Sequence, residues 1–316
     1  MIEHPMDVLS QFPVRKSKRQ KQAFRDAVGA YAASLGYASS VEKGSFGSQN
    51  VVIGDPERAS MLITAHYDTC ARMPIPNLIT PCNPWAFFAY QLLMAVILII
   101  PGLLLGFWAG QATGNRFVFL GVFYVIMFGS CGLMMLGPAN GHNANDNTSG
   151  VVTVLETART LPPELRSKIC FVLFDLEEAG LLGSAAHRKA HKTAVARQVM
   201  LNLDCVGDGD EILLFPTGTA QRNPGLMDWL KSHLPQPGKK SLTLRERGFS
   251  VYPSDQRGFP LGVGVAAFHR HPIVGLYCGK IHTRNDTILE KETSVPQPDP
   301  HVQGYGSGYQ QCKHSA

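Results

Sequence analysis

The chain has 316 residues, of which 45% are hydrophobic and 17% are charged, and its formal net charge is +5. This composition is that of a folded protein with one large domain or two modest ones, and the small charge gives no case for nucleic-acid binding. The seven cysteines are scattered singly, which argues against a disulfide framework and against a thiolate zinc site. This cysteine usage favours a reducing compartment.

The first predicted element is a helix over residues 16–35, where apolar side chains recur at helical spacing. Two short strands are predicted at 48–53 and 61–65, with turn residues between them. The second strand leads directly into His66 and Asp68.

A long apolar stretch, 73–145, contains a single formally charged residue, Arg116. Within it the uncharged runs 85–110 and 117–137 are each long enough to cross a hydrocarbon core, which needs about 20 residues. A short polar turn separates the runs, so both ends would return to the same side. We therefore predict a two-helix membrane hairpin over residues 84–137, with a buried or dimerising helix pair as the alternative.

Strands and helices alternate after residue 141. The predicted strands are 168–176, 198–205, 212–215 and, as a last central strand, 273–278, and the predicted helices are 149–161, 179–190 and 225–233. The alternation predicts an α/β fold with a mixed, mostly parallel central sheet and helices on both faces. Residues 1–80 and 138–294 would form one discontinuous domain, and 295–316 would be a disordered tail.

Five short polar segments lie at or just after the ends of predicted strands or in loops, where sites form in open α/β sheets. They are 66–68, 144–147, 177–184, 202–204 and 282–287. Together they offer two imidazoles and several carboxylates, a ligand set suited to zinc. Each segment alone is a weak signal. The most informative is the pair Glu177 and Glu178, because adjacent carboxylates after a buried strand repel each other unless a cation or a proton compensates one.

In this order the segments resemble those of the co-catalytic zinc aminopeptidases in the transferrin-receptor-like exopeptidase family, peptidase clan MH. The run 177–184, EEAGLLGS, is similar to that family's EExGLxGS-type signature, and 282–287, HTRNDT, is similar to its HTxxDT pattern. The resemblance covers about residues 16–80 and 140–292. It implies the zinc exopeptidase fold, interrupted here by the apolar hairpin on the active-site face.

The resemblance implies two zinc ions per chain, although other divalent metals could substitute. One ion would be bound by His66, Asp146 and Asp204. The other would be bound by Asp146, Glu178 and His282, so that Asp146 bridges the two. The resemblance also implies a cis peptide bond directly after this bridging aspartate.

Other roles follow from the same resemblance. Asp68 would accept the second N–H of His66 and fix its tautomer. Glu177 would be the general base and acid that takes a proton from the zinc-activated water and delivers it to the leaving amine. Tyr252 is a candidate oxyanion donor by position, with a surface tyrosine as the alternative. Gln256 replaces the histidine of the family's SDH segment, which puts details of the substrate pocket in doubt.

These residues predict a metal-dependent exopeptidase, most specifically an aminopeptidase that acts on peptides. A carboxypeptidase, a glutaminyl cyclase with one zinc, and a non-catalytic membrane scaffold of the same fold are the alternatives. The complete ligand set with Glu177 favours the peptidase. His187 and His191 are interpreted as surface or packing residues.

The charges flanking the hairpin predict a catalytic domain on the cytoplasmic side, since the far turn holds only Arg116. Arg72 and a basic cluster near the N-terminus lie on the other side, and the N-terminus lacks the apolar core of a signal peptide. The cluster could contact anionic headgroups, with a solvated helix face as the alternative. Its members are Arg15, Lys16, Lys18, Arg19, Lys21 and Arg25.

Overall fold

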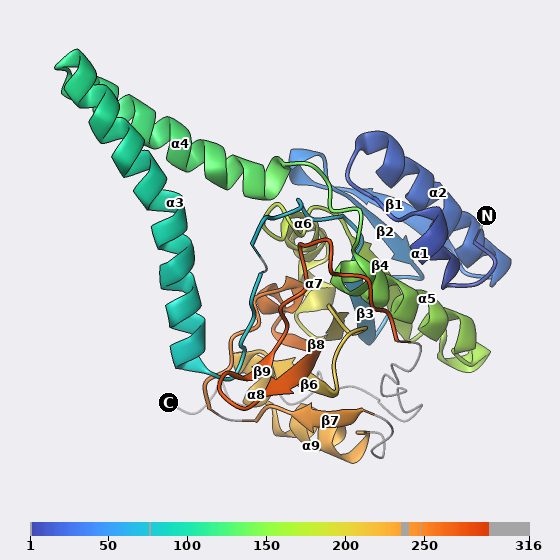
Figure 1. Ribbon diagram of the computed structural model, residues 1–316. Coiled ribbons are helices and arrows are strands. Elements are labelled where there is room, and N and C mark those ends of the chain that lie inside the picture. The colour runs from blue at the N-terminus through green and yellow to red at the C-terminus, as the bar shows by residue number, and fades with distance from the viewer. Residues whose placement is uncertain (1, 76, 235–239, 247, 291–316) are drawn as a thin grey trace, which may run out of the picture.

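A computed structural model describes residues 2–75, 77–234, 240–246 and 248–290 (Figure 1). The predicted tail 295–316 lies outside these residues. The helices are α1 (Asp7–Gln11), α2 (Lys18–Ser34), α3 (Pro84–Thr113), α4 (Arg116–Leu136), α5 (Gly150–Thr160), α6 (Leu182–Ala190), α7 (Lys192–Val195), α8 (Gly218–Gln221) and α9 (Pro224–Ser232). The strands are β1 (Ser39–Lys43), β2 (Gln49–Ile53), β3 (Met61–His66), β4 (Ile169–Phe174), β5 (Val199–Leu203), β6 (Glu211–Pro216), β7 (Ser241–Leu244), β8 (Leu261–His271) and β9 (Gly275–Tyr277). Shorter helical turns are η1 (Ser45–Gly47), η2 (Ala144–Ser149), η3 (Pro163–Leu165) and η4 (Asp255–Gly258).

The strands form one sheet in the order β1-β2-β4-β3-β5-β8-β6-β7, and β9 pairs with β8 off this path. The central strands β4, β3, β5 and β8 are parallel, whereas β1 with β2, β2 with β4, and β6 with β8 are antiparallel. Met61 pairs with Ile169 on one side and with Val199 on the other. The predicted α/β fold with a mixed, mostly parallel sheet is therefore confirmed, and its central strands end at one edge.

Side chains of the central strands are buried on both faces of the sheet. On β3, Ile63 belongs to the same apolar cluster as Val28 of α2 and Leu155 of α5. The neighbouring Leu62 points to the other face and belongs to a second cluster with Val195 of α7. Burial on both faces explains why these strands appear in the sequence as continuous apolar runs.

The prediction of a last central strand at 273–278 is wrong. The central strand is β8, which lies between β5 and β6, and β9 is a three-residue strand at the end of β8. Gly262 and Gly264 interrupt the apolar pattern of β8, so the sequence did not predict this strand. Gln256 of η4 leaves no room for a side chain at either position. A Cβ at Gly262 would lie 2.4 Å from the carbonyl oxygen of Gln256, and a Cβ at Gly264 would lie 2.7 Å from the Gln256 side chain. The exposed, polar strand β1 was also missed.

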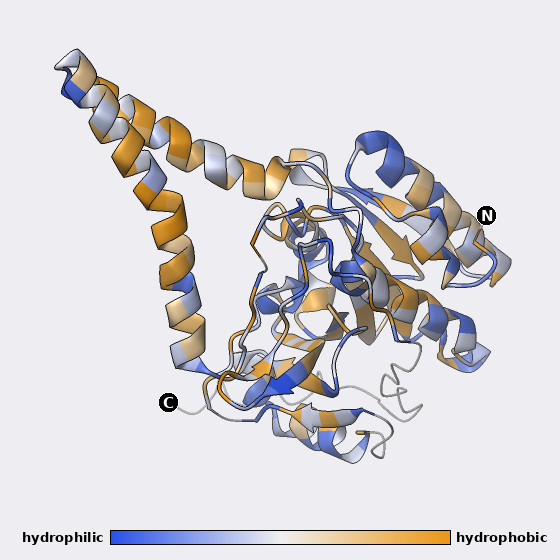
Figure 2. Cartoon of the chain, viewed as in Figure 1, coloured by the Kyte–Doolittle hydropathy of each residue, from blue (hydrophilic) through white to orange (hydrophobic). Residues whose placement is uncertain are grey.

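Helices α3 and α4, of 30 and 21 residues, form an apolar hairpin that projects from the body (Figures 1 and 2). Gly102, Gly106 and Gly110 of α3 lie against Phe119 and Phe123 of α4, and a Cβ on any of them would come within 3.1 Å of these residues. Small residues at a spacing of four allow helices to approach closely and are typical of packing between membrane helices. Both helices are long and apolar enough to cross a membrane.

The two legs of the hairpin diverge from its tip and join the body at separate places (Figure 1). Before α3, the Asn83 side chain donates a hydrogen bond to the carbonyl oxygen of Val274, at 3.2 Å. At the end of α4, Lys16 Nζ donates to the carbonyl oxygen of Met135, at 3.1 Å. The base of the hairpin is therefore attached both to the turn between β8 and β9 and to the segment before α2.

Half of the N-terminal basic cluster is buried rather than exposed. The Arg15 side chain is fully buried, Lys21 forms a 2.5 Å ion pair with Asp175, and Arg25 donates to the Tyr67 hydroxyl at 2.9 Å. Both alternatives for the cluster, contact with headgroups and a solvated helix face, are therefore wrong for these three residues. Buried charges need partners, and partners distant in the sequence supply them here.

We predict that Gly262→Ala destabilises the protein by about 1–3 kcal/mol, because its Cβ would meet the rigid Gln256 backbone. Gly141→Ala is the matched control, since a Cβ there meets nothing within 4 Å among the described residues. Thermal unfolding followed by circular dichroism should show a lower Tm for Gly262→Ala alone. Equal melting of the two variants would contradict the packing described for β8.

Candidate metal centre

The carboxyl ends of the parallel strands bring four of the predicted site residues together. His66 is the last residue of β3, and Asp204 directly follows β5. Glu177 and Glu178 lie in the turn after β4, the strand that pairs with β3 on its other side. Side chains that follow neighbouring parallel strands converge at one edge of the sheet, which is where α/β proteins bind ligands.

Asp146 lies between two groups of donor atoms. Its Oδ1 is 3.2 Å from His66 Nε2, and its Oδ2 is 3.0 Å from His282 Nε2. Asp204 Oδ1 is 3.7 Å from the same His66 nitrogen, and Glu178 Oε2 is 3.5 Å from the same His282 nitrogen. The structure thus brings together all five predicted ligands in two sets that share one carboxylate. That they bind metal remains a prediction.

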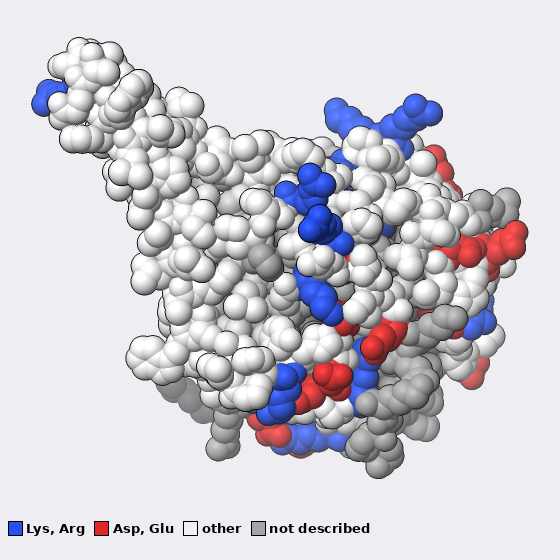
Figure 3. Space-filling view, viewed as in Figure 1, with Lys and Arg blue, Asp and Glu red and all other residues white. Residues whose placement is uncertain are grey.

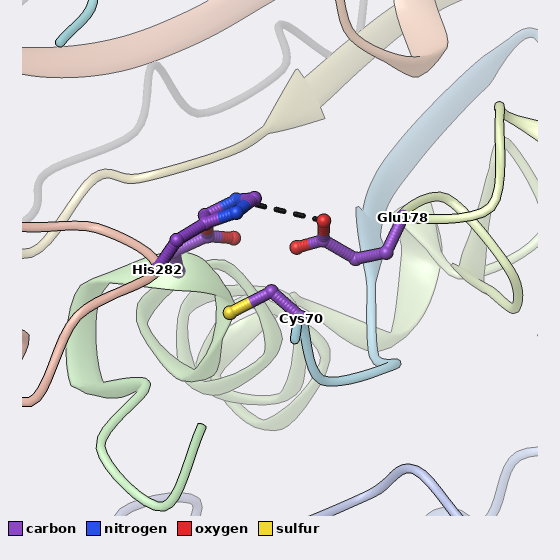
Figure 4. A group of neighbouring side chains, drawn as sticks. Cys70, Glu178 and His282 are labelled. Atoms are coloured by element: carbon purple, nitrogen blue, oxygen red, sulfur yellow. Dashed lines mark ion pairs between the residues drawn. The ribbon is translucent and has the colours of Figure 1, made fainter. Parts of the chain in front are cut away.

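Cys70 is a donor that the sequence did not reveal. Its sulfur lies in the same group of donor atoms as Asp146, Glu178 and His282, all within 4.8 Å of one another. Figure 4 shows the thiol beside the facing His282 and Glu178 side chains. A single cysteine without a nearby partner in the sequence gave no signal.

Asp68 contacts the glutamate turn, and it contacts His66 on the side that faces away from Asp146. One of its oxygens is 3.5 Å from Nδ1 of His66, the ring nitrogen that faces away from Asp146. The same carboxylate accepts backbone N–H bonds from Glu177 and Glu178, at 3.0 and 3.3 Å. One side chain therefore positions both a predicted ligand and the turn that carries the two glutamates.

Asp286 has a corresponding role behind Asp146. Its two oxygens accept the backbone N–H groups of Asn145 and Asp146, at 2.7 and 3.0 Å, and burial raises its pKa to about 7. The peptide bond between Asp146 and Asn147 is cis, as expected. Asp286 is the aspartate of the HTxxDT pattern, so the signal was in the sequence although its function was not assigned.

Arg15 connects the two loops that carry His66 and Asp146. Its guanidinium donates to the carbonyl oxygen of Tyr67 at 2.6 Å and to the Thr148 hydroxyl at 3.1 Å. Burial lowers its pKa to about 10, which still leaves the group charged at neutral pH. Sequence reasoning placed this residue in an exposed basic cluster.

Burial and crowding disfavour the charged forms of the two glutamates. Burial raises the pKa of Glu178 to about 8 and raises that of Glu177 well above its ordinary value. Burial would lower the pKa of His282, but the negative charge of Glu178 and the hydrogen bond and charge of Asp146 together outweigh burial and raise that pKa to about 9. Such shifts arise where carboxylates are removed from water beside one another.

The donor set fits a pair of divalent cations. Two imidazoles and three carboxylates are the nitrogen and oxygen ligands that zinc takes in catalytic sites, and cations would relieve the repulsion among the acids. Nδ1 of His66 is buried with the Asp68 carboxylate 3.5 Å away, and Nδ1 of His282 is buried without a hydrogen-bond partner in the described part of the chain. In both rings the other nitrogen, Nε2, faces Asp146.

Unusual backbone conformations cluster around the same residues. His282 itself, Leu176 beside Glu177, and Cys205 beside Asp204 all have positive φ angles, of 62°, 56° and 58°. Residues other than glycine rarely adopt this left-handed region, and such strain concentrates at functional sites.

A cavity of about 350 Å³ opens onto the donor atoms. Besides the five predicted ligands it is lined by Glu177, Tyr252 and Met135, the last from the end of α4. The hairpin therefore contributes to the site as well as projecting from the body. A neighbouring cavity of about 490 Å³ shares Tyr252 and Pro253 with it.

Tyr252 is buried, with 9% of its surface exposed, so the alternative of a surface tyrosine is wrong. Its hydroxyl donates to the carbonyl oxygen of Asp204 at 3.0 Å. Gln256, which replaces the histidine of the SDH segment, donates to the carbonyl oxygen of Tyr252 at 2.8 Å and accepts from Asn202 at 3.1 Å. The oxyanion role of Tyr252 stays a prediction.

The fold and the donor set define a protein of the metallo-exopeptidase type. The chain belongs to peptidase family M28, whose sequence model matches residues 130–297. No curated protein matches the sequence.

Among solved structures, the chain is similar to glutaminyl cyclase of Porphyromonas gingivalis, with a TM-score of 0.54 and 18% identity over 88% of this chain and 87% of that chain. It is also similar to the LapA aminopeptidase of Legionella pneumophila, with a TM-score of 0.53 and 14% identity over 90% of this chain and 63% of that chain. LapB of the same organism gives a TM-score of 0.50 and 16% identity over 90% and 63%. These likenesses show a shared fold, and the chain spans less than two thirds of LapA and LapB.

We predict that Asp286→Asn weakens zinc binding about 10- to 100-fold, the usual effect of removing a group that orients a ligand. The amide would face the Asn145 and Asp146 N–H groups with one oxygen in place of two. Competition with a chromophoric chelator measures the affinity. Asp228→Asn on α9, where the aspartate is exposed, is the control. Equal affinity in the two variants would exclude the supporting role.

Proposed function

We propose that this protein is a membrane-anchored aminopeptidase that uses a pair of metal ions, zinc by default. The observation that carries the proposal is the position of Asp146, with one oxygen facing His66 and the other facing His282. A carboxylate shared by two sets of ligands fits two ions held a few Å apart. When bound, such ions polarise a scissile carbonyl and acidify a water molecule.

Glu177 is the residue suited to move the proton. It is half-buried beside His66 and Glu178 and lines the cavity, but it belongs to neither of the two ligand sets that share Asp146. Its raised pKa would fall when cations bind nearby, because positive charge favours the carboxylate. Glu177 would then take a proton from the attacking water and pass it to the leaving amine.

The lining of the cavity favours the amino end of a peptide. Its described residues include four carboxylates, those of Asp146, Glu177, Glu178 and Asp204, and neither Lys nor Arg. Two divalent ions would offset the charge of these carboxylates, but the described lining would still offer no Lys or Arg to pair with a C-terminal carboxylate. This argument supports an aminopeptidase over a carboxypeptidase.

Metal analysis combined with a panel of matched peptides tests the proposed activity. The purified protein should contain two catalytic metal ions and cleave peptides with a free amino end, amidated or not at the other end. N-acetylated versions of the same peptides should resist cleavage. Formation of pyroglutamate from glutaminyl peptides without hydrolysis would indicate a cyclase, and no turnover in a metal-loaded protein would indicate a scaffold.

We predict that Glu177→Gln lowers kcat by about 100- to 10,000-fold, the usual contribution of general acid–base catalysis. The amide cannot accept the proton, while the ligand Glu178 is unchanged. Metal content, measured by mass spectrometry, should equal that of the wild type. Asp228→Asn again provides the control. Equal activity in Glu177→Gln would remove the assigned role.

We also propose that α3 and α4 cross a membrane and that the catalytic domain is discontinuous around them. The visible surface of the hairpin carries no charged side chain except a basic one at its tip (Figure 3), and Arg116 is the single charged residue of the stretch 73–145. Most of the hairpin is hydrophobic (Figure 2). Large side chains such as Trp85 and Leu136 are 84% and 78% exposed on it. An apolar surface of this size needs a partner, and the helix lengths match a bilayer. Met135 lines the cavity, so peptides would be cleaved close to the bilayer surface.

The orientation proposed is with the body in the cytoplasm. Arg72, Lys18 and Arg19 are exposed on the body, and Lys16 contacts the base of α4. The opposite end of the hairpin holds Arg116 alone. The excess of positive residues beside the base then corresponds to the cytoplasmic side.

We predict that replacing residues 84–136 by a short Gly-Ser linker moves the protein from the membrane pellet to the soluble fraction. A variant that still sediments with membranes would place the anchor elsewhere. Protease added to intact cells should leave the wild-type body undigested, because it lies inside. Digestion of the body without lysis would reverse the proposed orientation.

A further inference from the structure

A second group of side chains that could bind a metal lies toward the C-terminal end of α6, the helix that begins after the turn of Glu177. His187 is on α6, and His191 follows it one helical turn later, with its N–H bonded to the carbonyl oxygen of His187 at 2.9 Å. Their rings are 4.5 Å apart. Histidines four residues apart on a helix present their rings to the same point, a common arrangement for binding zinc.

Glu42 of β1 completes this group. Its Oε2 lies 3.1 Å from His187 Nδ1 and 2.7 Å from His191 Nε2, and all three donor atoms are within 4.8 Å of one another. Ligand atoms about 2.1 Å from a tetrahedral zinc ion are about 3.4 Å apart, so a small widening would admit the ion. The comparable contacts at the Asp146 centre are 3.0–3.7 Å.

Other side chains hold these three donors in place. Glu57 Oε1 lies 2.5 Å from His191 Nδ1, the nitrogen on the far side of the ring from Glu42. Asn50 donates to the other oxygen of Glu42 at 3.0 Å. Carboxylates bonded to the remote nitrogen of a ligand histidine are typical of zinc sites, where they fix the tautomer.

The backbone also brings the two elements close together. A Cβ on Gly44, just after β1, would lie 2.3 Å from the Cβ of Ala186 on α6. His187 is fully buried with its ring against Phe174, and its Nε2 has no hydrogen-bond partner in the described ranges.

We propose that Glu42, His187 and His191 form a third metal site, separate from the Asp146 centre, which binds zinc or a similar divalent transition metal. Three protein ligands leave one tetrahedral position for water, which the partly exposed His191 and Glu42 side chains allow. The ion would clamp α6 to the edge strand β1. Since α6 begins directly after the turn of Glu177 and Glu178, the clamp would stabilise that turn from outside the catalytic cavity.

Counting zinc in the full-length, detergent-solubilised protein tests this site. After chelation, reloading with zinc chloride and desalting, mass spectrometry should find one ion fewer per chain in His187→Gln/His191→Gln than in the wild type. His271→Gln, at an exposed histidine, should lose none. This loss is independent of whether the Asp146 centre loads. An unchanged count in the double variant would show that the cluster is a set of hydrogen-bonded charges only.

Two further variants keep the test decisive if the double variant does not fold. His66→Gln/Asp146→Asn/His282→Gln lacks donors of both ligand sets of the catalytic centre, so zinc should still bind at one ion per chain and raise its Tm. Adding His191→Gln to it should abolish this rise. Glu57→Gln retains all three ligands, and its affinity for zinc should fall about 10- to 100-fold. Absence of a zinc-dependent Tm rise in the first variant, or full affinity in Glu57→Gln, would overturn the proposal.

Discussion

The site depends on one buried carboxylate, that of Asp146, placed between the imidazoles of His66 and His282. Burial would raise the pKa of Asp146, but hydrogen bonds from these two histidines outweigh it and hold the pKa low. Around this carboxylate the fold collects more acids than it could keep ionised without cations. Burial is the main cause of the raised pKa values of Glu177 and Glu178, and the negative charges of neighbouring carboxylates add to it.

Much of the surrounding structure holds these side chains in position relative to one another. The parallel strands deliver His66, Asp204 and the glutamate turn to one edge, and buried polar groups connect the loops between them. Arg15 joins the loop after β3 to η2, and Asp286 holds the backbone of Asp146. Because these groups form hydrogen bonds to the backbone as well as to side chains, they fix the backbone positions from which the ligand side chains extend. Preorganisation of this kind is what a site with ordered ligands requires.

The sequence predicted the parts of the molecule that short patterns encode. Ordered motifs predicted Asp146 and the four donors that surround it, and the absence of charge on either side of Arg116 predicted the hairpin. Contacts between distant segments could not be predicted from the sequence, because no local pattern distinguishes a buried, paired Arg15 from an exposed one. The strand β8 was missed for a similar reason, because Gly262 and Gly264 are required by packing against Gln256 and not by residues next to them in the sequence. His187 was interpreted as a packing residue because its partner Glu42 lies 145 positions away.

The position of bound zinc tests the central claim most directly. Anomalous diffraction at the zinc absorption edge, from crystals of the full-length protein, would locate each ion without reference to activity. The account predicts two peaks about 3.5–4 Å apart on either side of the Asp146 carboxylate, each about 2.0–2.2 Å from one of its oxygens. A single peak on the His66 side, or no peak beside Asp146 in zinc-loaded crystals, would contradict a shared carboxylate and the two-metal chemistry inferred from it.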